Sequence, residues 1–127
     1  MARSDLPRPT DAEISILQVI WEHQPCTVRR VWEELSRVHK TGYNTVLKLM
    51  QIMTTKGLVV RDESNKAHLY TATREREQTQ GQLVRDLMTR AFEGSAAAMA
   101  IRALSEKRAT PEELDEIRRL LDGMDQG

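Results

Sequence analysis

The chain has 127 residues, of which 39% are hydrophobic and 30% are charged, and its formal net charge is zero; this suits one compact domain, or a small domain whose lean core gains from a partner. The single cysteine, Cys26, excludes an intrachain disulfide and a cysteine metal cluster, and three scattered histidines give no metal-ligand spacing, so we expect no metal site and no cofactor. No stretch has the length and apolarity of a signal peptide or of a membrane span, so we expect a cytoplasmic protein that does not insert into membranes.

Three helices are predicted in the first half of the chain. Thr10 and Glu13 form a capping box that starts the first helix, and Thr27 is placed to cap a second helix that runs to about residue 37. The third helix is predicted over Tyr43–Lys56, with an apolar stripe on one side, and Gly57 stands where a left-handed C-cap is wanted.

Two short strands are predicted after the third helix. Leu58–Arg61 and Ala67–Thr71 have the residue types of strands, and the polar residues 62–66 between them form a turn. Three helices followed by a hairpin is the element order of a winged helix-turn-helix domain. We therefore expect a mainly α fold with a small β-hairpin.

The remainder of the chain is predicted to be helical and to dimerise. Helices are expected over Glu75–Phe92, over 96–104 after a Ser95 cap, and from a Thr110 capping box to Gly123. These helices are too few to enclose a core, so a second copy of the chain is the simplest partner. The expected organisation is a DNA-binding domain at 1–74 and a helical dimerisation region at 75–127. The predicted dimerisation residues are Leu83, Leu87, Met88, Phe92, Met99, Ile101, Leu104, Leu114, Ile117 and Leu121.

Basic residues are concentrated in the middle of the chain. Residues 27–61 hold seven basic and two acidic side chains, whereas residues 76–127 hold eight basic and ten acidic ones. A basic segment beside a mildly acidic tail is typical of a DNA-contacting surface with a separate assembly region.

The third helix carries the residue types that read bases. In a helix-turn-helix, the second helix of the pair enters the major groove. Asn and Gln bond adenine edges, Lys reaches guanine acceptors and the Thr methyl touches thymine. The predicted base-reading residues are Asn44, Thr45, Lys48 and Gln51. The predicted phosphate contacts are Arg29, Arg30, Lys40, Tyr43, Arg61 and Lys66, although Tyr43 is equally able to seat its helix on the core.

An ordered set of motifs resembles the penicillinase-repressor, or BlaI/MecI-type, family of winged-helix regulators. The resemblance covers about residues 9–122 and rests on the 10–13 capping box, Tyr43–Lys48, Lys56–Val59, residues 61–70, residues 92–95 and the final helix. It implies a homodimer that binds a palindromic double-stranded DNA operator and blocks transcription. Many members carry an arginine late in the third helix, where this chain has Gln51 or Ile52.

The resemblance also implies a way in which repression ends. In such families a membrane sensor-peptidase often cuts the dimerisation region, and by position the cut falls near Arg102 and Ala103. The best-known members have an Asn-Phe pair there, and this chain has none. The copper-responsive CopY-like branch has a C-terminal cysteine cluster, which this chain lacks.

The sequence also allows two other classes of function. A winged-helix module whose basic stretch binds an acidic protein would have the same composition, and indifference to duplex DNA would favour it. A small enzyme would need a reactive group, and Cys26 at a helix start is the one candidate. No convergent catalytic set accompanies it, so we do not expect an enzyme.

Overall fold

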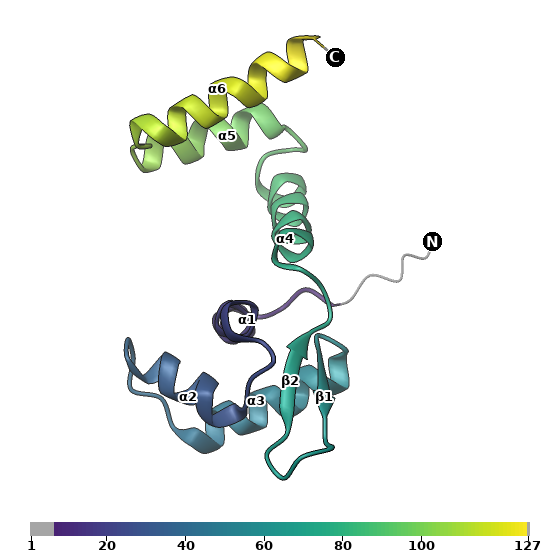
Figure 1. Ribbon diagram of the computed structural model, residues 1–127. Coiled ribbons are helices and arrows are strands. Elements are labelled where there is room, and N and C mark those ends of the chain that lie inside the picture. The colour runs from purple at the N-terminus through teal and green to yellow at the C-terminus, as the bar shows by residue number, and fades with distance from the viewer. Residues whose placement is uncertain (1–6, 127) are drawn as a thin grey trace. The chain divides into compact units, whose positions relative to one another are not determined.

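The computed structural model describes residues 7–126, which form six helices and one two-stranded sheet (Figure 1). The elements are α1 (Asp11–His23), α2 (Val28–Ser36), α3 (Tyr43–Lys56), β1 (Val59–Asp62), β2 (Leu69–Ala72), α4 (Arg76–Ala91), α5 (Ala96–Glu106) and α6 (Pro111–Gln126). The predicted fold class, mainly helical with a small hairpin, is confirmed. None of the helices in this range combines the length and the apolar composition needed to cross a membrane.

The chain divides after Leu83 into two compact units, and the division falls inside α4. The boundary predicted from the sequence, between residues 74 and 75, precedes α4 and stays a prediction of where the dimerising region begins. Residues 1–6 and 127, which the predicted domains include, lie outside the described residues.

The predicted helix caps of the first unit are confirmed. The Thr10 hydroxyl accepts a hydrogen bond from the Glu13 N–H at 3.2 Å, and Glu13 Oε1 accepts one from the Thr10 N–H at 2.9 Å. Thr27 caps α2 through the Arg30 N–H at 3.1 Å. Gly57 ends α3 with φ of 84°, a left-handed conformation that a residue without Cβ adopts at little cost.

The core of the first unit lies where α1, α2 and α3 pack together and against the hairpin. Its largest fully buried side chain is Tyr70 of β2. Ile16, Leu17 and Ile20 supply the buried face of α1, whereas Trp21, at the end of that helix, is half-buried. The remaining core residues are Cys26, Val28, Val31, Val46, Met50, Met53, Leu58 and Val59.

The hairpin pairs β1 with β2 in antiparallel register, from Val59 opposite Ala72 to Asp62 opposite Leu69. Cys26 adds a bridge on the other edge of β2, where its N–H donates to the Tyr70 carbonyl at 3.1 Å and its carbonyl accepts the Tyr70 N–H at 2.7 Å. The predicted strand limits were wrong by one or two residues. Leu58 closes the end of α3, because its N–H donates to the Met53 carbonyl at 2.9 Å.

The second unit contains the end of α4 and the helices α5 and α6. Ser95 caps α5 through the Ala98 N–H at 3.0 Å, and Thr110 and Glu113 form the predicted capping box of α6 at 2.9 and 3.0 Å. The predicted end of the last helix at Gly123 is wrong, since α6 continues to Gln126. Glycine inside a helix costs only about 1 kcal/mol relative to alanine, so it need not stop one.

Candidate nucleic-acid interface

The helix α3 has one fully buried face and one open face. Val46, Met50 and Met53 are 0% exposed, because they pack into the core. Asn44, Thr45, Lys48 and Gln51, the predicted base-reading residues, are all exposed. Asn44, Lys48 and Gln51 follow one another at steps of four and three residues, which places them along one side of the helix. We call these three residues the α3 stripe.

The start of α3 is held by two aromatic residues, Trp32 of α2 and Tyr43, the first residue of α3. The Trp32 indole N–H donates to the Thr41 carbonyl at 2.7 Å, which ties α2 to the turn before α3. The Tyr43 ring meets the Trp32 ring edge to face, with centroids 5.8 Å apart and planes at 79°. Tyr43 is also 39% exposed, so it seats the helix on Trp32 and leaves part of its side chain in contact with solvent.

Three of the predicted phosphate-contacting residues line one cleft. Arg29 from α2, Tyr43 from α3 and Lys66 from the hairpin loop share a cavity of about 430 Å³. Arg29 lies 5.7 Å from the Trp32 ring centroid and pairs with Glu33 at 3.3 Å, yet 70% of its side chain is exposed. The cleft thus collects two cationic groups, from Arg29 and Lys66, and the phenol of Tyr43 from segments that are separate in the sequence.

The same cleft contains His68, which is not among the predicted site residues. His68 is exposed and follows Lys66 by two residues in the loop of the hairpin. The sequence signal for His68 was its place in the predicted hairpin, two residues after Lys66. An imidazole beside Lys66 and Arg29 is a third nitrogen-bearing group for an anionic ligand of this cleft.

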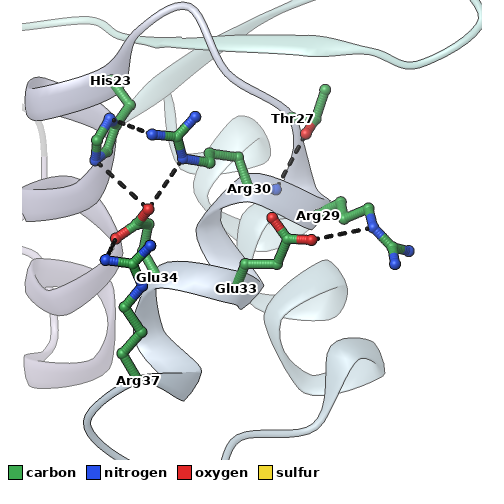
Figure 2. Close-up of polar contacts among 7 residues, drawn as sticks. All are labelled: His23, Thr27, Arg29, Arg30, Glu33, Glu34 and Arg37. Atoms are coloured by element: carbon green, nitrogen blue, oxygen red, sulfur yellow. Dashed lines mark hydrogen bonds and ion pairs between the residues drawn. The ribbon is translucent and has the colours of Figure 1, made fainter.

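Arg30 is held in a polar network between α1 and α2 (Figure 2). Its Nη2 lies 3.0 Å from His23 Nδ1, and its Nε donates to Glu34 Oε2 at 3.1 Å. Glu34 is also reached by Arg37 at 3.6 Å and by His23 Nε2 at 4.0 Å. The predicted phosphate contact of Arg30 therefore competes with the contacts that join it to α1.

Arg61, in β1, is also engaged within its own hairpin. Its guanidinium pairs with Glu63 at 2.6 Å, and hydrogen bonds with Tyr70 and Glu63 raise the pKa of Arg61. The neighbouring Asp62 accepts hydrogen bonds from the backbone N–H and the hydroxyl of Ser64 at 2.9 and 2.6 Å, which lower the pKa of that carboxyl. The turn of the hairpin is thus stabilised by its own polar side chains.

A buried ion pair that the sequence did not reveal joins the start of α1 to the end of α3. Lys56 Nζ lies 2.8 Å from Glu13 Oε2, and the Glu13 side chain is 2% exposed. These residues are 43 positions apart, so no local pattern indicates the pair. Of the seven basic residues between 27 and 61, five are paired with carboxylates, and the two without a partner among the described residues are Lys40 and Lys48.

The predicted dimerisation residues lie on helices with little cover. Within the described chain, α5 and α6 contain no buried residue. Leu87, Ile101, Leu104 and Leu121 are between 43% and 64% exposed. The other predicted members are half-buried: Leu83, Met88, Phe92, Met99, Leu114 and Ile117. Arg102 and Ala103, where the family cut would fall, are exposed residues in the middle of α5.

Comparison with known proteins gives the family of the chain. Residues 9–123 match the family model described as penicillinase repressor. The chain belongs to the penicillinase repressor family.

Two curated relatives illustrate the similarity over nearly full length. The chain is 30% identical to "Transcriptional regulator BlaI" of Mycobacterium tuberculosis over 123 residues, which cover 96% of this chain and 88% of the relative. It is 21% identical to "Penicillinase repressor" of Bacillus licheniformis over 117 residues, 92% of this chain and 91% of the relative.

Solved structures within this family share the fold of the first unit. The DNA-binding domain of the repressor BlaI, solved in solution, aligns with a TM-score of 0.51 and 23% identity, over 58% of this chain and 90% of that domain. The Bacillus licheniformis BlaI monomeric form, solved in complex with the blaP half-operator, gives a TM-score of 0.51 and 23% identity, over 57% of this chain and 89% of that one. The predicted winged-helix fold is confirmed.

Proposed function

We propose that this chain is a transcriptional repressor that binds a palindromic operator as a homodimer, with α3 in the major groove. The observation that carries the proposal is the α3 stripe, whose three exposed side chains stand opposite a fully buried face of the same helix. A buried face fixes the rotation of the helix, so the stripe points outward in a defined direction. Amide and ammonium groups held in this way suit direct reading of base edges.

Phosphate contacts would flank the base-reading helix on both sides. Arg29, Tyr43 and Lys66 line the cleft beside α3, and Lys40 is exposed in the turn that precedes it. Such contacts supply affinity and salt dependence without sequence choice. Arg30 and Arg61 would have to share their guanidinium groups between DNA and the carboxylates that they already contact.

A homodimer is supported by the uncovered apolar side chains of the second unit. Ile101 and Leu121 are 64% and 53% exposed, and a groove of about 580 Å³ between α5 and α6 is lined in part by Leu104, Ile117 and Leu120. Covering these side chains with a second copy removes apolar surface from water. Two-fold pairing would also present two recognition helices about one DNA turn, roughly 34 Å, apart.

The end of repression would follow from loss of this pairing. The bond between Arg102 and Ala103 lies in exposed α5, and a cut there would separate α6 from the DNA-binding unit. We propose a sensor-peptidase of the membrane as the inactivating partner. Insertion of a site for a sequence-specific protease after Arg102 tests the principle, with cleavage expected to release operator DNA; retention of full affinity after cleavage would contradict it.

The decisive test of the DNA face is charge reversal at Lys48. Operator fragments are first recovered by incubating the purified protein with sheared genomic DNA and sequencing the bound fraction. Lys48→Glu is expected to abolish binding of these fragments in a gel-shift assay at moderate salt, with helix content and oligomeric state unchanged.

A charge-matched pair separates the position from the net charge. Lys48→Gln and Gln80→Glu each lower the net charge by one, and Gln80 is exposed on α4, in the same compact unit. Only Lys48→Gln is expected to weaken binding, by about 1–3 kcal/mol if Lys48 contacts a base. Equal losses in both variants, or no recovered DNA at all, would refute the proposal.

The dimer is tested by charges placed on its apolar face. Ile101→Asp and Leu121→Asp are expected to yield monomers in sedimentation analysis and to weaken operator binding by about 10² to 10⁴, the gain that linking two sites provides. Val38→Asp, a change at a 76% exposed apolar residue of the first unit, is the control and is expected to leave the dimer intact. A wild-type chain that sediments as a monomer would exclude the homodimer.

A further inference from the structure

The segment that leaves the hairpin is held to the first unit by successive hydrogen bonds. The Ala72 N–H donates to Gln24 Oε1 at 2.9 Å. The Thr73 N–H donates to the Leu58 carbonyl at 3.0 Å, and its hydroxyl donates to the Gly57 carbonyl at 2.7 Å. The chain therefore enters α4 through a fixed segment and not through a flexible linker.

Trp21, near the end of α1, also holds the segment that leaves the hairpin. Its indole N–H donates to the Arg74 carbonyl at 2.9 Å, across 53 residues of sequence. Two residues later, the guanidinium carbon of Arg76 lies 5.8 Å from the centroid of the Trp21 ring, within the range of a cation–π contact. One side chain thus contacts both Arg74, just before α4, and Arg76, the first residue of the helix.

The contact between Arg76 and Trp21 leaves one polar atom of Arg76 without a hydrogen bond in the described part of the chain. The Arg76 Nε is buried and has no hydrogen-bond partner among the described residues. An unpaired buried donor is unfavourable, and the contact that this guanidinium makes is its packing on the Trp21 ring. Thr79, one turn further, is 5% exposed and is the buried residue of α4, which places this end of the helix against the first unit.

We propose that Trp21 is a positioning residue for operator binding, which clamps the exit of α4 and thereby selects the spacing between the two half-sites. The inference rests on the proposed function, since it requires a homodimer on two-fold DNA. We call Trp21, Arg74 and Arg76 the α4 clamp. None of its members belongs to the α3 stripe or to the cleft beside it.

The physical reason is that the clamp limits the directions in which α4 leaves the DNA-binding unit. Residues up to Leu83 belong to the same compact unit as α3. A helix attached by a fixed segment keeps one direction, whereas a helix on a free hinge takes many. When two units are joined through such helices, a fixed direction raises the effective concentration of the second unit at one half-site spacing and lowers it at others.

The test compares affinity for one half-site with affinity for two. The probes are duplexes that carry the recovered operator, the same operator with one or two base pairs inserted or deleted at its centre, and a single half-site. The full-length variants are Trp21→Phe, which removes the indole N–H, and Arg76→Met, which removes the guanidinium. Trp32→Phe is the matched control, because Trp32 also donates its indole N–H to a backbone carbonyl, in the turn before α3.

Trp21→Phe is expected to weaken binding of the intact operator at least tenfold, to change single half-site affinity less than twofold, and to flatten the dependence on spacing. Arg76→Met is expected to act in the same direction. Trp32→Phe is expected to weaken both kinds of binding alike and to retain the spacing preference. In the DNA-free protein, Trp21→Phe should accelerate hydrogen exchange of amides in residues 76–80 more than that of amides in α3.

If Trp21→Phe weakens binding of a single half-site by the same factor as binding of the intact operator, Trp21 acts only through the stability of the core. That result would overturn the inference. An unchanged spacing preference in both Trp21→Phe and Arg76→Met would overturn it as well. A wild-type chain that binds one half-site as tightly as two is a different failure, because it would remove the dimeric repressor itself and this inference with it.

Discussion

Neutralising Glu13, which is not among the predicted DNA contacts, is expected to destabilise the first unit. Glu13→Gln preserves the size of the side chain and an oxygen that can accept the Thr10 N–H, but it removes the counter-ion of Lys56. A hydrogen bond to a charged group contributes about 1.5–3 kcal/mol. The Lys56 side chain is 31% exposed, so its ammonium can turn to water, and we expect a loss of about 2 kcal/mol.

Removing the cation and keeping the carboxylate should lower the free energy of unfolding further, because Glu13 is more deeply buried than Lys56. Lys56→Met leaves a carboxylate whose side chain is 2% exposed without its cation, and removal of one partner of a buried pair costs about 3–5 kcal/mol. The double variant should recover part of this loss, since neither charge is then left alone. Urea unfolding followed by the fluorescence of Trp21 and Trp32, both in the first unit, measures these differences.

The dependence on pH gives an independent check of the same pair. Burial raises the pKa of Glu13, but the hydrogen bonds from Lys56 and Thr10 and the charge of Lys56 outweigh it and lower the pKa below the usual 4.5. The unfolded chain then binds the proton more readily than the folded one, so the stabilisation is complete above pH 4.5 and is lost as the pH falls through the folded value. The free energies of unfolding of the wild type and of Glu13→Gln should therefore become equal as the pH is lowered. Equal stability of the two at pH 7, or a difference that persists unchanged in acid, would refute the reasoning.

Three further predictions follow from individual residues. Burial raises the pKa of the Cys26 thiol more than the nearby charge of Arg30 lowers it. The folded protein should therefore resist a thiol reagent at pH 7 and react in urea with one equivalent per chain. Rapid labelling of the folded protein would count against this. Gly57→Ala should lower the free energy of unfolding by about 1–2 kcal/mol in urea titrations, because φ of 84° is unfavourable once a Cβ is present; unchanged stability would mean that the helix end relaxes. Lys66→Gln should reduce the slope of log affinity against log salt by about 0.9 if Lys66 contacts one phosphate, and an identical slope would exclude that contact.

Several features of the fold were predictable because they depend on residues that are close together in the sequence. The Thr10 capping box, the Thr27 cap and the left-handed Gly57 are interactions within one helical turn, so residue type and spacing identify them. The open face of α3 followed from the helical period of its apolar residues. Lys48 was placed correctly on the exposed side for this reason, although its contact with DNA stays a prediction.

Other parts were decided by the packing of segments that are distant in the sequence. Lys56 reads as a member of a basic patch, yet it is neutralised by Glu13, which lies 43 positions away in the sequence. Composition counts such charges but contains no information on which carboxylate folding will bring beside them. Local sequence therefore determined the helices, their caps and their amphipathic faces, whereas tertiary structure alone decided that Glu13 neutralises Lys56 and that Trp21 anchors α4, because those contacts join residues separated by 43 and 53 positions.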